Sequence, residues 1–408
     1  MNGAFPLKLF ITKNIKFMKK KIFIACAALV VSAATAVGYK ACKSNMPPTT
    51  NRIYIDVENI DKTFDVTQLC DSIEVQDIIV LETNDDSLIG EVSNISIVDN
   101  QIFIIDNLMH GINVFDLNGV FKYQIQHQGR ARNEYIEMTD VFIDTNNIYV
   151  LDNGSQKIVI YNLKGNYEYM IDISNYWAHN IFVVNDAIYL INKWSKTENG
   201  MYRLFIIDKN GKLLSKQLAF DEEDCNRYFS EECAYAISNM KNICYPSDNT
   251  IYTILENGRC EPFLNIDFQK QAMPSKYTTM DFTETLKNGI HNKYIYGIER
   301  ITSSSRYLFI SYSYLSERYN TIYDYQTHDY HNIKSFNGGS TFDLPLNKFF
   351  ITDNYLVAYI DANTFLLTIK YSLLDKDERN KYIQQVRRIE QKLSDEDNGI
   401  LIIHKLKK

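Results

Sequence analysis

The chain has 408 residues, of which 45% are hydrophobic and 13% aromatic, so it can bury a large core. Residues 1–36 hold six of the 43 basic residues and none of the 50 acidic ones, which leaves the rest of the chain with a net charge of −13. Because phosphate groups are bound by clustered Lys and Arg, this balance argues against nucleic acid or an anionic membrane surface as a partner.

The first forty residues are typical of a secretory leader. Lys19–Lys21 precede an apolar run from Ile22 to Val37, and Ala34-x-Ala36 supplies the small residues of a cleavage site. We therefore interpret residues 1–36 as an N-terminal extension and signal peptide. The mature protein is expected to be exported to the periplasm or the cell envelope.

Two alternatives remain open for this leader. Its apolar run lies at the lower end of the roughly 17–25 residues that a membrane-spanning helix needs, so the leader could stay in place as an anchor. Lipid attachment at Cys42 is the other alternative, although Tyr39-Lys40-Ala41 is a poor match to the residues that normally precede a lipidated cysteine. We expect membrane contact only in these two cases. Residues 37–72 are assigned to a linker and leading segment.

Beyond the leader, the chain repeats a pattern of four β-rich runs separated by polar turns. Repeats of about 40 to 65 residues built of four short strands are the signature of a β-propeller. The turn residues agree, because Asn118-Gly119, Lys164-Gly165 and Asn210-Gly211 occupy the same place in three successive repeats and suit two-residue hairpins. The predicted blades span residues 91–126, 135–173, 178–218, 234–268 and 296–336.

The sixth blade needs a strand from the other end of the chain. Residues 348–361 supply two strands and residues 399–406 a third, whereas residues 73–82 (IEVQDIIVLE) supply the missing outer strand. This pairing closes the ring and removes its open edges. The sequence therefore predicts an all-β fold, a six-bladed β-propeller over residues 73–408. One helical insertion is predicted at residues 375–393, where apolar positions recur every three or four residues.

The first blade also resembles a known repeat. Its strands NISIVD and INVFDLNG, and the connection that ends in Glu134-Tyr135, are similar to NHL-type repeats. Together with the leader, the segment IIVLETNDDSLIG and the closing DNGILIIHKLK, the chain resembles a family of exported bacterial six-bladed propellers whose members are mostly uncharacterised. This resemblance implies the fold and export, and it implies no chemistry.

Four cysteines lie between Cys225 and Cys260. No C-x-x-C unit and no histidine occurs among them, so we expect no metal site there. Buried thiols within strands are one interpretation. A local disulfide between Cys233 and Cys244, on adjacent strands of the predicted fourth blade, is the other.

Sequence motifs for catalysis or cofactor binding are lacking. Seven histidines are present, none in a recognised metal spacing, and we find no G-x-S-x-G, P-loop or dinucleotide motif. No cofactor and no catalytic residue is therefore predicted. Asp106 and Asp152 end matching strands, and although a carboxylate pair is conceivable, a repeated aspartate is more simply a turn-capping residue.

Long insertions fall on one face of the predicted propeller. In a four-stranded meander, the loops between second and third strands and the connections between blades emerge on the same side, and loops on rigid scaffolds carry function. Both tryptophans map to these loops, next to polar groups that suit a sugar or a peptide. The expected ligand-binding residues are Trp177, Trp194, His179, Tyr176, His110, Arg130 and Arg132.

These observations favour an exported, non-enzymatic binding or interaction protein that uses the loop-rich face. Its ligand would be a glycan, a peptide or an envelope protein. A carbohydrate-active hydrolase or lyase with catalytic groups at the central channel is the alternative, and a purely structural role in the envelope is a further one. Propellers host all of these functions, so the fold does not choose among them.

Overall fold

The structure of the protein is a computed structural model, and it describes residues 51–408 with several gaps. The residues outside the description are 1–50, 72–76, 194, 223–233, 239, 246–247, 275–276, 278–281, 296, 338–348, 353–354 and 373–380.

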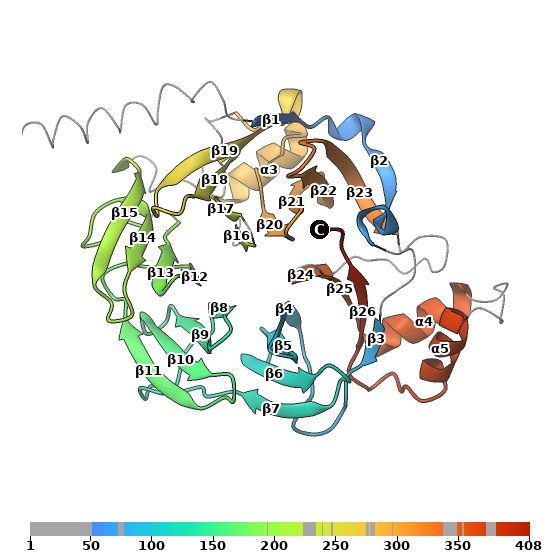
Figure 1. Cartoon of the computed structure of the whole chain (residues 1–408). Coiled ribbons are helices and arrows are strands. Elements are labelled where there is room, and N and C mark those ends of the chain that lie inside the picture. Colours follow the sequence, from blue (N-terminus) through green and yellow to red (C-terminus); the bar gives the residue numbers. More distant parts are fainter. Residues whose placement is uncertain are drawn as a thin grey trace, which may run out of the picture. The chain divides into compact units, whose positions relative to one another are not determined.

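Six sheets surround a central channel in the described part of the chain, which confirms the predicted six-bladed propeller (Figure 1). Within each blade the first strand lies at the channel and the last strand at the rim. Blade 1 contains β4 (Val92–Val98), β5 (Gln101–Asp106), β6 (Gly111–Asp116) and β7 (Phe121–Ile125); blade 2 contains β8 (Asp140–Ile143), β9 (Asn147–Asp152), β10 (Lys157–Asn162) and β11 (Tyr167–Asp172); blade 3 contains β12 (Asn180–Val184), β13 (Ala187–Ile191), β14 (Tyr202–Ile207) and β15 (Leu213–Ala219).

Each of the remaining three blades also pairs with a strand from the N-terminal part of the chain. Blade 4 contains β16 (Ala234–Ile237), β17 (Lys241–Cys244), β18 (Thr250–Ile254) and β19 (Cys260–Asp267); blade 5 contains β20 (Arg300–Ser303), β21 (Tyr307–Tyr314), β22 (Glu317–Asp324) and β23 (Tyr330–Asn337); blade 6 contains β24 (Phe349–Thr352), β25 (Tyr355–Ile360), β26 (Ile400–Lys405) and β3 (Asp77–Val80).

The N-terminal strand closes the ring as predicted. Strand β3 pairs antiparallel with β26, with Ile79 opposite Leu401, and becomes the outer strand of blade 6. Both side chains are buried. Closure therefore joins two strands that are more than 300 residues apart in the chain, and the last blade gains its fourth strand.

The segment assigned to a linker supplies two further strands. Strand β1 (Asn51–Tyr54) pairs parallel with β19 at the rim of blade 4, and β2 (Asp61–Asp65) pairs parallel with β23 at the rim of blade 5. Figure 1 shows both strands, in blue, along the outer edge of the ring. Parallel strands are not joined by a hairpin turn, so no turn residues in the sequence indicate that they pair. The sequence pattern therefore did not reveal these strands.

The helices lie outside the blades. The expected helix is present as α5 (Lys381–Glu390), which ends before the predicted boundary at residue 393, while residues 375–380 of the prediction lie outside the described residues. It follows α4 (Ala362–Ser372), which was not predicted. Phe365 of α4 and Val386 of α5 are buried in one cluster with residues of blade 6. The connection from blade 4 to blade 5 contains a further helix, α3 (Phe282–Asn292), also absent from the prediction.

Hydrophobic residues fill the space between neighbouring blades. The cluster between blades 2 and 3, for example, joins Leu151 and Ile160 to Ile181 and Phe205. Because each blade packs both faces against its neighbours, the buried residues form one hydrophobic cluster at each of the six interfaces between blades, around the central channel. Within the described residues, no helix is both long and apolar enough to cross a membrane.

Candidate functional site

Two aspartates hold the loops of blades 1 and 2 in place. The Asp106 carboxylate accepts hydrogen bonds from the backbone N–H of Gly90 (2.6 Å) and of Met109 (3.0 Å). Asp152 does the same one blade later, accepting from Ile136 N (2.9 Å) and Ser155 N (3.0 Å). Each carboxylate thus joins the loop after its own strand to the connection that enters the blade. The turn-capping interpretation is confirmed.

Five large hydrophobic side chains are exposed on these loops and connections, and we call them the apolar arc. Their exposed fractions range from 40% to 65%. Leu108 and Met109 lie in the loop between the second and third strands of blade 1, and the other three lie in connections between blades, which emerge on the same face. Contiguous exposed apolar side chains on one face mark interaction surfaces. The apolar arc consists of Leu88, Leu108, Met109, Ile136 and Trp177.

Hydrogen bonds between successive loops hold the arc together. Gln126 Nε2 donates to Met109 O (2.7 Å), and the hydroxyl of the buried Tyr135 donates to His110 O (2.7 Å). Further along, Lys157 Nζ donates to Ala131 O at 2.8 Å. These bonds tie backbone carbonyls to side chains of the blades, so the loops under the exposed residues have fixed positions.

The predicted ligand-binding residues of blade 1 surround this arc. His110 follows Met109 in the chain with a positive φ of 49°, and its carbonyl is held by Tyr135. Arg130 and Arg132 are exposed on the connection from blade 1 to blade 2. They place positive charge on the connection that also carries Ile136 of the arc.

The predicted residues near blade 3 have different roles. Trp177 is half-exposed and belongs to the arc. Tyr176 is buried, packs against Phe205 and donates a hydrogen bond to Gly211 O (3.1 Å), which makes it a structural anchor of the connection. Trp194 lies outside the described residues, so its expected platform with Trp177 stays a prediction.

His179 sits where the connection enters the first strand of blade 3. Its Nδ1 is buried without a hydrogen-bond partner. Burial, and secondarily the charge of Lys193, lower the pKa of His179 to about 4. The imidazole is therefore neutral at physiological pH and brings no charge to this face.

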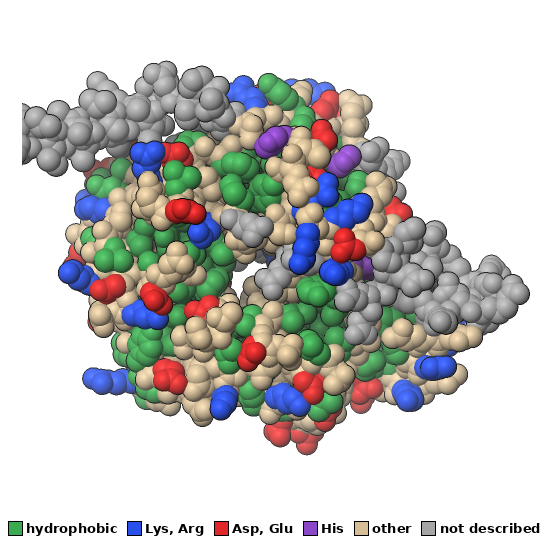
Figure 2. All heavy atoms as spheres, in the orientation of Figure 1, with side chains coloured by type: hydrophobic (Ala, Val, Ile, Leu, Met, Phe, Trp, Pro, Cys, Tyr) green, Lys and Arg blue, Asp and Glu red, His purple; other side chains and the backbone are tan. Residues whose placement is uncertain are grey.

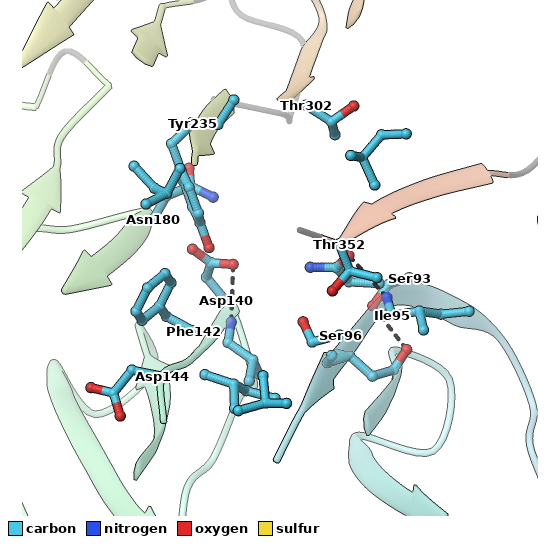
Figure 3. Close-up of a pocket in the computed structure, with 18 of the residues that line it drawn as sticks. Ser93, Ile95, Ser96, Asp140, Phe142, Asp144, Asn180, Tyr235, Thr302 and Thr352 are labelled. Atoms are coloured by element: carbon cyan, nitrogen blue, oxygen red, sulfur yellow. Dashed lines mark hydrogen bonds between the residues drawn. The ribbon is translucent and has the colours of Figure 1, made fainter. Parts of the chain in front are cut away.

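The central channel contains a cavity of about 600 Å³, which is within the range of small-molecule sites (Figure 3). The first strands of blades 1, 2, 4, 5 and 6 form its walls, and blade 3 contributes Asn180. Hydroxyl and amide groups alternate with apolar side chains around it. Labelled residues facing one another across the channel in Figure 3 are Ser96, Thr302 and Thr352 on one side and Asp140, Asn180 and Tyr235 on the other.

Asp140 is the most perturbed acid of this channel. Its carboxylate accepts hydrogen bonds from the backbone N–H of Val141 and of Ile181, both at 2.9 Å, and from the side chains of Asn180 and Tyr235. Burial raises the pKa of Asp140 to about 6 despite these donors, and burial also raises the pKa of Tyr235 well above its usual value. The carboxylate is fully engaged by blades 2, 3 and 4.

Besides Asp140, the carboxylates that line the cavity are Asp99 and Asp144, which follow the first strands of blades 1 and 2 at hairpin turns. Within the described residues, no group of three or more His, Cys, Asp or Glu side chains is arranged to hold a metal ion.

Sequence reasoning did not single out Asp140 or Tyr235. One signal was available: Asn94 occupies the corresponding place in blade 1, and both side chains accept from the next backbone N–H, at 2.9 Å. The recurrence of Asn or Asp in the first strand of both blades marks this position. The contact with Tyr235, however, joins residues 95 apart and follows from the ring alone.

The disulfide prediction falls largely outside the description. Cys233 is not among the described residues, whereas Cys244 is buried in β17. Ala234, the chain neighbour of Cys233, lies directly opposite Cys244 in the sheet. The pairing of the two cysteines stays a prediction.

Comparison with known proteins concerns the fold. The family model described as Domain of unknown function (DUF4934) matches residues 52–405, and no curated protein matches the chain. A Bacteroides fragilis protein described as a candidate exported protein is 19% identical, with a TM-score of 0.68 over 88% of this chain and 100% of that chain. A DUF4221 member from Bacteroides vulgatus is 11% identical (TM-score 0.48, 82% and 98% covered), and virginiamycin B lyase from Staphylococcus aureus is 14% identical (0.38, 64% and 73%).

Proposed function

This chain belongs to the DUF4934 family, and we propose that it is an exported, non-enzymatic binding protein that holds a peptide or protein partner on the apolar arc. The observation that supports the proposal is the arc itself. Its five side chains are exposed, yet the loops that carry them are fixed by buried aspartates and by hydrogen bonds between blades. A preorganised apolar surface loses little conformational entropy on binding.

The composition of the arc favours a polypeptide over a sugar. Four of its five members are aliphatic or methionine, and Trp177 is its single aromatic ring. Sugars are bound by aromatic rings together with polar groups, whereas Leu, Ile and Met pack against apolar side chains of a partner. The exposed Arg130 and Arg132 beside the arc suit acidic residues at the edge of that partner.

Charge around the ring supports recognition by local contacts. Figure 2 shows acidic and basic side chains interspersed around the rim of the face in view, with hydrophobic side chains between them. A surface of mixed sign produces no strong field for long-range steering. The affinity of the proposed complex would therefore depend on apolar contacts and change little with salt.

Peptide and glycan arrays probed with the purified protein test the proposal. We expect peptides with apolar and acidic residues to bind, and the double variant Leu108→Ser/Met109→Ser to bind them at least about tenfold more weakly, as for interface anchors. Leu117→Ser/Val120→Ser is the matched control, because these residues are similarly exposed in a turn of the opposite face. Binding of glycans alone, or equal loss in both double variants, would contradict the proposal.

The alternative function is a carbohydrate-active hydrolase or lyase in the channel. Its support is Asp140, because acids with a raised pKa gather at catalytic sites. A survey of polysaccharide and glycoside substrates with wild type and Asp140→Asn tests it. Turnover that disappears in the variant would favour the enzyme over the binding protein.

Export is part of the proposal and rests on the leader, which lies outside the described residues. We also infer from the blade 1 residues that the repeats are of NHL type. Localisation to the periplasm or envelope is tested by fractionating cells that express the full chain. Recovery of the protein in the cytoplasm with an intact leader would contradict it.

A further inference from the structure

The outer strands of blades 1, 2 and 3 can be compared residue by residue. Each follows a turn whose glycine has a positive φ: Gly119, Gly165 and Gly211. Four residues after the glycine, the chain has Tyr123, Tyr169 and Ser215; six residues after it, Ile125, Ile171 and Gln217. Blade 3 therefore departs from its neighbours at both positions that face the next blade.

Between blades 1 and 2, the tyrosine fills the seam. A Cβ atom placed on Gly165 of blade 2 would lie 2.9 Å from Cε2 of Tyr123 and 3.5 Å from Cγ1 of Ile125. The Tyr123 hydroxyl donates a hydrogen bond to Leu163 O in the same turn of blade 2, at 2.5 Å. The ring and the isoleucine thus both reach this turn of blade 2 across the seam.

The next seam, between blades 2 and 3, is closed in a similar way. A Cβ atom on Gly211 would lie 3.2 Å from Cγ2 of Ile171. Burial raises the pKa of Tyr169, and the charges of Lys209 and Asp186 also act on it. Because these two residues belong to the two turns of blade 3, Tyr169 lies near those turns. The tyrosine and the isoleucine again face the following blade.

Between blades 3 and 4, the corresponding space is open. A Cβ atom on Gly258 of blade 4 would meet only the hydroxyl of Tyr189, at 4.0 Å. Gln217 spans the gap instead, donating to Gly258 O (2.6 Å) and accepting from Cys260 N (2.7 Å). A cavity of about 500 Å³ remains, and Ser215 lines it.

Aromatic packing returns at the following seam. Phe263 of blade 4 lies 6.0 Å from the ring of Tyr323 and 5.9 Å from the ring of Tyr325, both in blade 5. In the seam between blades 3 and 4, a serine thus stands where blades 1 and 2 have a tyrosine, although the rings of Phe182 and Tyr235 pack across the same seam at 5.4 Å, where the first strands of the two blades meet. Large-to-small replacements of this kind leave cavities that bind ligands of the missing shape.

We propose that the cavity between blades 3 and 4 binds a phenolic ring of a small molecule, in the place that corresponds to that of Tyr123 between blades 1 and 2, two blades earlier. Its lining combines apolar and polar side chains. The apolar lining residues are Val184, Ala187, Ile206, Leu214 and Leu255, and the polar ones include Tyr189, Lys241, Glu256, Asn257 and Arg259. This site is separate from the apolar arc, because it lies at turns of the opposite face.

The probe for this proposal is p-cresol, which has the structure of a tyrosine side chain. We expect p-cresol to raise the melting temperature of the wild-type protein in a saturable way. The variant Ser215→Tyr should fill the cavity itself, melt higher than wild type and bind p-cresol at least about tenfold more weakly. The conservative variant Ser215→Ala should keep the response.

Two controls make the result decisive. The aliphatic analogue 4-methylcyclohexanol should stabilise the protein less than p-cresol does, because the site is expected to select a planar ring. Leu117→Ser, in a turn of blade 1 away from this seam, should leave the p-cresol response unchanged. Absence of binding to wild type, equal binding by Ser215→Tyr, or equal stabilisation by both probes would overturn the proposal.

Discussion

The carboxylate of Asp140, in the channel strand of blade 2, accepts a hydrogen bond of 2.9 Å from the backbone N–H of Ile181 in the channel strand of blade 3. A similar link joins blade 6 to blade 1, where Ile97 N donates to Thr352 Oγ1 at 3.1 Å. Polar side chains at the channel therefore connect neighbouring blades in addition to the hydrophobic packing between them. These links hold the inner ends of the blades at fixed spacing.

Asp140 should make stability depend on pH. Its folded-state pKa of about 6 exceeds the ordinary 3.8, so the folded protein binds this proton more tightly than the unfolded chain does. The free energy of unfolding contributed by this group thus falls as pH rises from about 4 to 6, by at most about 3 kcal/mol, and is constant above. Chemical denaturation of wild type and Asp140→Asn across pH 4–7 measures the difference. Parallel profiles for the two proteins would refute the shift.

Two turn glycines should respond differently to the same substitution. Gly119 and Gly258 have similar positive φ angles, 82° and 77°, so alanine strains both backbones by about 1–2 kcal/mol. At Gly119 the new Cβ would also lie 2.1 Å from Val80 O in the closing strand, whereas at Gly258 it meets open space. We expect Gly119→Ala to lower the free energy of unfolding by at least about 2 kcal/mol more than Gly258→Ala. Equal losses in urea titrations would show that the seams are packed alike.

Adjacent residues Tyr176 and Trp177 should separate packing from binding. Tyr176→Phe removes the hydroxyl that donates to Gly211 O and should cost about 1 kcal/mol of stability without changing affinity for array peptides. Trp177→Ala should change stability by less than about 0.5 kcal/mol, because its ring is half-exposed, and weaken binding by about 1–3 kcal/mol. The reverse result would place Trp177 in the fold and remove it from the binding surface.

Strands β1 and β2 should protect the rims of blades 4 and 5. Deleting residues 1–70 removes both and uncovers the backbone edges of β19 and β23, so we expect a lower melting temperature and self-association. Deleting residues 1–50 leaves both strands and is the control. Light scattering after size-exclusion chromatography measures the outcome. A monomer with unchanged melting after the longer deletion would show that these strands add nothing to the fold.

Local patterns in the sequence were sufficient for the blade order and for closure of the ring. Hairpin strands are joined by short turns, so Asn118-Gly119 and its counterparts report on pairs that are also neighbours in the chain. The strand at residues 73–82 was found for the same reason, since its alternating β-rich run completes a blade that otherwise has three strands. Asp106 and Asp152 were correctly interpreted as turn caps because they recur at one place in the repeat.

Contacts between blades were decided by the tertiary structure. Ile53 of β1 lies opposite Ile266 across more than 200 residues, and the side chains of Asp140 and Tyr235 meet only because blades 2 and 4 surround one channel. The apolar arc is likewise assembled from three connections between blades and one loop of blade 1. The presence of Ser215 in place of a tyrosine was visible in the sequence. The cavity beside it, however, exists only because blade 4 packs next to blade 3 and encloses the space that the tyrosine ring would have filled. Pairing between distant segments leaves no local periodicity in the sequence, because the paired residues come into contact only when the ring has closed.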